Sequence, residues 1–254
     1  MDPLNDSDPS RTIIEQLLAL TFNLVRVDAP GRPTEPIGLA SGFVIGKEGK
    51  QYFLTAGHVA RSGPWFWECT LDSAEGCLLI PVGPFTQFAS GKISPGGELD
   101  FDRSVVPAAD FAWAPFEPKA IGEKLKSFKV PKQPFTFEFY HGPLDRTIAP
   151  GEPCVLAAHS RGTIEALRLT YLRRDACIQD LEFQSTNEKG HHVFKPAGGH
   201  QGHDFYRGAS GAPISNSDGV IVSMLVGGSD SGDEIWGQPL SLIAHLAGFD
   251  PVGH

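Results

Sequence analysis

The chain has 254 residues, of which 41% are hydrophobic, enough for the core of one large β or α/β domain or of two subdomains. This composition excludes a disordered protein, and the 29 glycines and 21 prolines favour many short strands over long helices. The formal net charge of -9, without a dense basic stripe, argues against a nucleic-acid or anionic-membrane surface.

The N-terminal segment and the cysteines both bear on the compartment of the protein. The first six residues are acidic and polar, whereas a secretory signal has a basic start and then an apolar run. No stretch approaches the ~20 apolar residues that span a bilayer. We therefore expect a cytoplasmic protein. The cysteines then stay free thiols, although Cys69 with Cys77, and Cys154 with Cys177, are the pairs that an oxidising compartment would allow.

The first half of the chain predicts a helix and then a series of strands. Apolar residues at helical spacing follow Ser10 and predict a helix that ends at Leu20. Short apolar segments bounded by glycine, proline and polar residues predict strands over 23–27, 39–46, 52–56, 65–69 and 76–82. The third of these strands ends on Gly57-His58, which holds His58 at a strand end with little local bulk.

A second candidate residue, Asp110, comes just before the next predicted strand. Phe111 and Trp113 alternate there with small residues, as in a half-buried strand. A carboxylate at such an edge becomes partly buried, and buried carboxylates are paired or hydrogen-bonded. Asp100 and Asp102 are alternatives, but they belong to a polar loop.

The second half of the chain follows a lysine-rich linker over 117–134 and predicts strands again. They cover 135–140, 153–158, 167–172, 220–226 and 235–240, and a short helix is predicted over 242–246. The segment 191–204 is rich in glycine and histidine and is interpreted as a loop. Two runs of short strands, with helices mainly at the ends, predict two packed β-barrels.

The third candidate residue is Ser210, within Gly208-Ala209-Ser210-Gly211-Ala212-Pro213. Small neighbours let a substrate backbone approach closely and let two N–H groups point at one spot, as an acyl-transfer nucleophile requires. The pattern alone is more typical of a turn. However, His58, Asp110 and Ser210 come in the chain order of a chymotrypsin-type triad.

The segments LTAGHV at 54–59 and GASGAP at 208–213, with Asp110 between them, resemble the trypsin-like serine peptidases of the chymotrypsin fold. The pattern is closest to the protease domain of the bacterial high-temperature-requirement type, without a PDZ region. The resemblance implies an all-β fold of two six-stranded antiparallel β-barrels. We expect a helical extension over 1–21, a first barrel over 22–125, and a second barrel with a short C-terminal helix over 126–254.

The resemblance also implies roles for single residues. Ser210 would be the nucleophile, His58 the general base and acid, and Asp110 the carboxylate that orients His58. The N–H groups of Gly208 and Ser210 would form the oxyanion hole. By family position, Asp204 would form the base of the specificity pocket, with Ser223 and Gly227 on its wall. An acidic base favours Arg or Lys at P1, the substrate residue whose carbonyl is attacked.

We therefore expect a serine endopeptidase that acts on proteins or peptides and needs no cofactor or metal. Secreted zymogens place an aspartate before the serine, to pair with a newly cut N-terminus; here that residue is Ala209. Activation by N-terminal cleavage is thus not expected. Restraint by a regulatory protein partner or by narrow specificity is expected instead, with neither nucleic acid nor membrane as a partner.

Four other interpretations stay open. The chain would be a catalytically silent module that holds a peptide if the triad does not work. Alternatively, residues 158–162, AHSRG, imitate the nucleophile elbow of α/β-hydrolases and make Ser160 the nucleophile. The histidines and Asp204 of segment 191–204 are candidate zinc ligands, although they lack a cysteine and lie in a glycine-rich loop. The same segment directly precedes the serine and is a candidate gate for the site.

Overall fold

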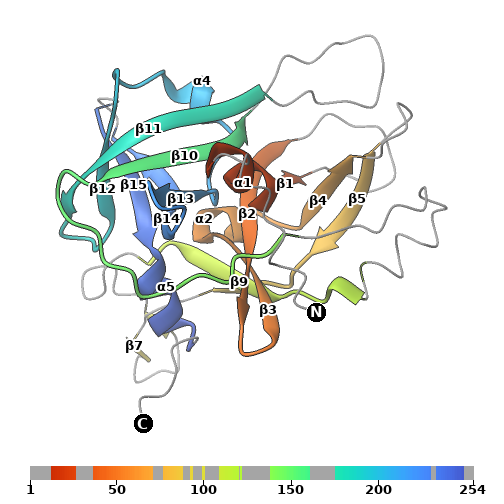
Figure 1. The fold of residues 1–254 in the computed structure, drawn as a ribbon. Helices are drawn as coiled ribbons and strands as arrows, with labels where there is room; N and C mark the ends of the chain where they lie inside the picture. The colour runs from red at the N-terminus through yellow and green to blue at the C-terminus, as the bar shows by residue number, and fades with distance from the viewer. Residues whose placement is uncertain are drawn as a thin grey trace, which may run out of the picture.

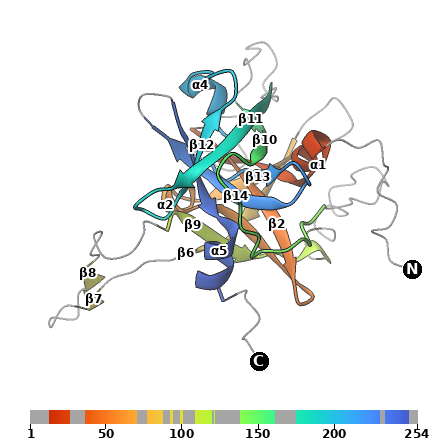
Figure 2. The ribbon, with the colours of Figure 1, turned by 60° about the vertical axis from the view of Figure 1, so that its left-hand side comes forward.

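The computed structural model describes residues 13–26, 37–70, 77–87, 92–93, 99–100, 109–119, 121, 138–160, 175–229 and 233–248. The described chain is mostly β-structure and forms two halves that pack against each other, the first at the lower right of Figure 1 and the second at the upper left. Figure 2 shows the same two halves in a turned view.

The first half is an open antiparallel sheet in the order β5-β4-β1-β2-β3-β9-β6. Its strands are β1 Thr21–Arg26, β2 Gly38–Lys47, β3 Lys50–Ala56, β4 Trp65–Thr70, β5 Cys77–Val82, β6 Thr86–Gln87 and β9 Phe111–Pro115. Two short strands, β7 Lys92–Ile93 and β8 Leu99–Asp100, pair only with each other. The β2–β3 hairpin turns at Glu48 and Gly49, both at positive φ, as the twist of a two-residue hairpin requires.

The second half is a closed antiparallel barrel of six strands in the order β10-β11-β12-β15-β14-β13. The strands are β10 Pro153–Ser160, β11 Asp175–Thr186, β12 His192–Pro196, β13 Pro213–Asn216, β14 Ile221–Gly228 and β15 Ile235–Pro239. Its interior is filled by apolar side chains from every strand, among them Leu156, Leu181, Phe194, Ile214 and Leu225. The predicted six-stranded barrel is therefore confirmed for this half.

The first half differs from the prediction in one respect. Over the described residues its sheet has seven strands and does not close into a barrel. Its two edge strands, β5 and β6, are consecutive in the chain, so residues 83–85 join the two edges covalently where hydrogen bonds do not. A half-barrel results, and the all-β fold class is confirmed.

Two helices bind the halves together. Helix α1 Ile13–Leu20 buries Leu17 in a core that contains Phe43 of β2 as well as Val155 of β10. Helix α5 Leu240–Leu246 buries Ile243 in the same core. Because this core includes side chains from both halves, burial of apolar surface holds one half against the other. No helix in the described part of the chain has the length and apolar character to cross a membrane.

Some predicted elements differ from the observed ones. Of the expected strand over 135–140, residues 135–137 lie outside the described residues, and Tyr140 forms an isolated parallel bridge with Ile45. The expected strand over 167–172 and the side chains of Cys69 and Cys77 lie outside the described residues. Cys154 and Cys177 are free, and burial raises the pKa of each thiol to about 12.

Candidate active site

The histidine of the site stands where β3 ends and a short helix, α2 Gly57–Arg61, begins. Residue 57 must be a glycine, because there is no room for a side chain at this position. A Cβ atom at this position would lie 2.8 Å from Oδ1 of Asp110 and 3.0 Å from the backbone nitrogen of Phe111. A glycine before His58 therefore lets the aspartate, which leads into β9, approach the start of the helix.

His58 and Asp110 form a close pair. Nδ1 of His58 lies 2.6 Å from Oδ2 of Asp110, and the backbone N–H of His58 donates to Oδ1 at 2.8 Å. The two side chains are 43% and 19% exposed. With Nδ1–H bound to the carboxylate, the neutral imidazole presents Nε2 as a lone pair, the form that a general base needs.

A third residue, Arg61, joins this pair. Its guanidinium donates to Oδ1 of Asp110 at 3.0 Å. Burial by itself raises the pKa of Asp110, but the hydrogen bond and charge of His58 and the charge of Arg61 outweigh burial and hold the pKa below its ordinary value. Asp110 is therefore a stable carboxylate.

The second half also holds Asp110. Gln238 of β15 is fully buried, and its Oε1 accepts the backbone N–H of Asp110 at 3.0 Å. Sequence reasoning identified neither Arg61 nor Gln238. Arg61 lies three residues after His58, so the two side chains share one face of α2 once that helix is known. No local signal identifies Gln238, which is distant in sequence.

The loop with Ser210 is anchored to the first half through Ser41 of β2. The Ser41 backbone N–H donates to the carbonyl of Ser210 at 2.8 Å, and its hydroxyl donates to the carbonyl of Gly208 at 2.8 Å. The hydroxyl of Thr55 in turn donates to the carbonyl of Ser41 at 2.8 Å. Gly211, with φ at 93°, brings the loop so close that a Cβ there would lie 2.1 Å from the Ser41 oxygen.

The N–H groups of this loop fall into two sets. Those of Ala209 and Gly211 donate to the carbonyls of Tyr206 and Leu225, each at 2.8–2.9 Å. Those of Gly208 and Ser210 donate no hydrogen bond within the described residues. The Ser210 hydroxyl likewise makes no hydrogen bond there, to His58 or to any other described group. Two donors and one hydroxyl are therefore unengaged around Ser210.

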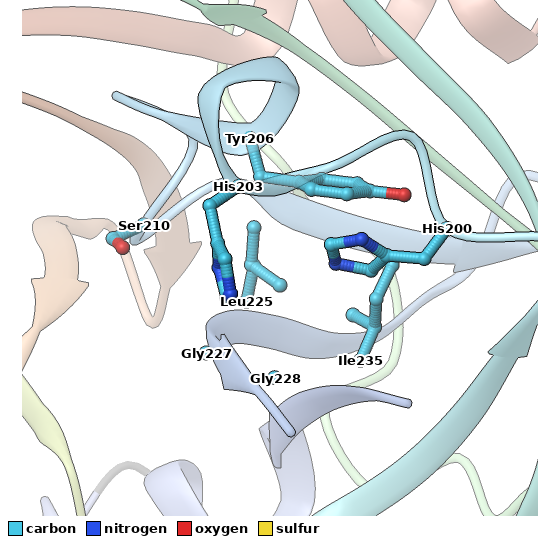
Figure 3. A pocket seen from close by; sticks show the side chains of 8 residues that line it. All are labelled: His200, His203, Tyr206, Ser210, Leu225, Gly227, Gly228 and Ile235. Atoms are coloured by element: carbon cyan, nitrogen blue, oxygen red, sulfur yellow. The ribbon is translucent and has the colours of Figure 1, made fainter. Parts of the chain in front are cut away.

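A pocket opens beside Ser210 (Figure 3). It is lined by His200, His203, Tyr206, Ser210, Leu225, Gly227, Gly228 and Ile235. The histidines and Tyr206 come from the loop before the serine and from the short helix α4 His203–Tyr206. Apart from Ser210, the other lining residues come from β14 and β15.

The residues predicted for specificity occupy different places. Gly227 lines the pocket. Asp204 is exposed on α4 and is not among the lining residues, so the expectation of Arg or Lys at P1 loses the residue on which it rested. Ser223 is fully buried in β14, and its hydroxyl lies 2.6 Å from Nδ1 of His192.

The alternative sites receive no geometric support. Ser160 ends strand β10, which pairs antiparallel with both of its neighbours, whereas the nucleophile elbow of an α/β-hydrolase follows a strand of a parallel sheet. The expected loop over 191–204 contains strand β12, which places His192 in the barrel wall. Among the described residues, no three histidine, cysteine or acidic side chains gather as metal ligands.

No protein-family model matches the chain, and no curated protein matches it in sequence. Two solved structures are similar in fold. A serine endoprotease from Yersinia pestis has a TM-score of 0.49 and 11% identity over 92% of this chain and 63% of that one. The MamO protease domain from Magnetospirillum magneticum, in its apo form, has a TM-score of 0.48 and 15% identity over 91% of this chain and 96% of that one. The chain thus spans 63% of the length of the Yersinia protein.

The strand order and the positions of the site residues together define the fold. A closed six-stranded antiparallel barrel carries the serine loop, and an adjoining antiparallel half-barrel carries the histidine and the aspartate. This arrangement agrees with the chymotrypsin-like fold that the sequence predicted, with the first barrel open.

Proposed function

We propose that the protein is a serine endopeptidase that hydrolyses peptide bonds through Ser210, His58 and Asp110. The observation that carries the proposal is the 2.6 Å contact between Nδ1 of His58 and Asp110, formed next to a serine loop that Ser41 holds against the same half. A pair of this kind fixes the imidazole tautomer and stabilises the imidazolium that arises when the serine is deprotonated.

In the proposed reaction, Oγ of Ser210 attacks the carbonyl carbon of the substrate while its proton moves to Nε2 of His58. The resulting oxyanion accepts hydrogen bonds from the N–H groups of Gly208 and Ser210. His58 then gives its proton to the leaving amine nitrogen as the peptide C–N bond breaks, and an acyl-enzyme remains. Water repeats the sequence in the second step and releases the acid.

The Ser210 hydroxyl must turn toward His58 for this reaction, because it makes no hydrogen bond with a described residue in the resting site. Catalytic hydrogen bonds often tighten only when substrate binds. The same unengaged hydroxyl favours a second candidate function, a silent module that holds a peptide without cleaving it.

Restraint of the proposed activity would not use an N-terminal zymogen switch. Ala209 is fully buried in the apolar core of the second barrel, so this position offers no carboxylate to a new N-terminus. We propose restraint by a regulatory protein partner or by narrow specificity, in a cytoplasmic protein that contacts neither nucleic acid nor membrane.

A fluorophosphonate probe, which reacts with activated serines, tests the proposal. We expect labelling of the folded chain, loss of labelling in Ser210→Ala and His58→Ala, and retention in Ser160→Ala, the matched serine control. Labelling that persists in Ser210→Ala would overturn the proposal. Folded protein that binds peptides but is not labelled would establish the silent module instead.

A further inference from the structure

The pocket beside Ser210 has the size and walls for one substrate side chain. Its volume is about 170 Å³, which corresponds to five or six water molecules at ~30 Å³ each. Leu225 and Ile235 supply apolar wall, and the two glycines Gly227 and Gly228 add no side chains of their own. A side chain the size of glutamine fits this space, with its methylene groups against the apolar wall.

The polar groups of the pocket can be assigned one by one. The Tyr206 hydroxyl is engaged, because it donates to Oε1 of Gln179 at 3.0 Å. None of the lining residues is acidic, lysine or arginine. An Arg or Lys side chain would find no countercharge among them, and burial of an unpaired charge is costly. His200 and His203 remain as the polar groups that a substrate side chain can meet.

The tautomer of His200 is set by its own loop. The backbone N–H of Gly202 donates to Nδ1 of His200 at 3.0 Å, so the proton of the neutral ring lies on Nε2. Figure 3 shows the ring of His200 extending into the pocket toward His203, with a ring nitrogen on that inner side. The ring centroids of the two histidines are 5.6 Å apart. The pocket therefore contains a fixed N–H donor.

His200 stays neutral around pH 7. Burial, followed by the charge of His203, lowers its pKa, while Asp233 acts in the opposite direction. Tyr206, whose ring centroid is 4.7 Å from that of His200, covers the other face of the imidazole. The ring of His203 makes no hydrogen bond within the described residues, so its N–H is also available to a ligand.

We propose that the pocket selects glutamine at P1, a neutral side chain whose terminal oxygen accepts the N–H of His200 and that of His203. The proposal rests on the proposed function, since P1 is defined by attack of Ser210. Glutamine suits the neutral imidazole of His200, whereas glutamate would bring a negative charge that no lining residue neutralises.

Peptide substrates that differ only at P1 test this selectivity. With Gln, Glu, Met and Arg at P1, we expect kcat/KM for Gln at pH 7.5 to exceed that for each of the other three at least tenfold. Met is unbranched and of similar length but lacks the acceptor oxygen. A site built to hydrogen-bond a group rejects the analogue without it.

A variant that lacks the N–H donor of His200 tests the same preference within one pocket. His200→Phe keeps a ring in place and removes the N–H, so the preference for Gln over Met should fall below threefold. His245→Phe, at an exposed position on α5, is the control and should keep the preference. Equal rates for Gln and Met in the wild type, or an undiminished preference in His200→Phe, would overturn the proposal.

Failure of the pocket proposal and failure of the proposed function are separable. In Ser210→Ala, a product peptide that ends in glutamine should shift the ring ¹⁵N resonances of His200, and one that ends in methionine should not. That difference supports the pocket even if the probe never labels Ser210. Normal labelling of the wild type, with identical shifts from both peptides, would reject the pocket proposal alone.

Discussion

Arg61 and Asp110 form an ion pair in which Nη2 of the guanidinium lies 3.0 Å from Oδ1 of the carboxylate. The same carboxylate binds His58 through Oδ2, so one acid is shared between a fixed cation and an imidazole. The Arg61 side chain is 56% exposed, and exposed ion pairs add little to folding stability. Its effect should therefore be local, on the charge and orientation of Asp110.

Our first prediction concerns a variant that lacks the charge of Arg61. In Arg61→Gln the pKa of Asp110 should rise toward its ordinary value, because one of the charges that lower it is gone. The free energy of unfolding should change by less than ~1 kcal/mol. Carboxyl ¹³C chemical shifts across a pH titration measure the pKa. Arg61→Lys keeps the charge and should move the pKa less; a fall of the pKa in Arg61→Gln would contradict the prediction.

Our second prediction concerns the contact between Gly211 and Ser41. In Gly211→Ala the new Cβ would lie 2.1 Å from the Ser41 carbonyl oxygen, at a φ of 93° that side chains disfavour. We expect the free energy of unfolding to fall by ~2 kcal/mol or more, together with loss of probe labelling.

A second glycine separates this clash from backbone strain. Gly151 has a φ of 83° and nothing within 4 Å of its Cβ position. Gly151→Ala should therefore lose only the ~1 kcal/mol of the backbone conformation, and labelling should persist. Urea denaturation measures both variants. Equal losses in the two would show that the contact with Ser41 does not matter.

The third prediction tests the connection between Gln238 and Asp110. Gln238→Leu leaves the backbone N–H of Asp110 without its acceptor, which should cost ~1–3 kcal/mol of unfolding free energy. Probe labelling should also slow, because Asp110 is less firmly held beside His58. Gln184→Leu, at an exposed side chain whose hydrogen bonds within the described residues go to Glu182, should stay within ~0.5 kcal/mol of wild type. Wild-type stability and labelling in Gln238→Leu would refute the connection.

The fourth prediction follows from His192, which burial holds at a pKa of about 4, below its ordinary 6.5. Between these pH values the unfolded chain binds a proton that the folded chain excludes. The contribution of His192 to stability is thus fully present above pH 6.5 and is lost as pH falls toward 4. Each pH unit in this window should remove up to ~1.4 kcal/mol.

Chemical denaturation at several pH values checks this slope. His192→Gln should flatten it, because glutamine does not titrate. His245→Gln, at an exposed position, should keep the wild-type slope. An unchanged slope in His192→Gln would assign the acid sensitivity to other groups.

The sequence predicted the position of His58 and of Asp110 because each stands where an apolar strand begins or ends. It did not predict β11. In most strands apolar side chains point inward and polar ones outward, but two residues of β11 do the opposite. Gln179 points inward and is 5% exposed, whereas Ile178 points outward and is 39% exposed. Strand β12 was missed for a related reason, because Val193 and Phe194 are adjacent and both are buried, which breaks simple alternation.

The supporting residues of the site were beyond prediction. Gln238 is 128 positions from Asp110, and Ser41 is 167 positions from Gly208, so only the folded topology brings them together. Asp204 was assigned to the pocket by counting back from Ser210. The loop places His200 and His203 there instead, and short loops change side-chain direction in ways that a count of residues does not capture.

The hydrogen bonds of Ser41 determine how the protein would lose its proposed activity in denaturant. Asp110 and His58 belong to one half, Ser210 to the other, and Ser41 joins them by two bonds at 2.8 Å. The alignment of Ser210 with His58 therefore depends on the contact between the two halves, and neither half provides it alone. Mild denaturant that loosens this contact would abolish the chemistry while both β-structures still give their full circular dichroism.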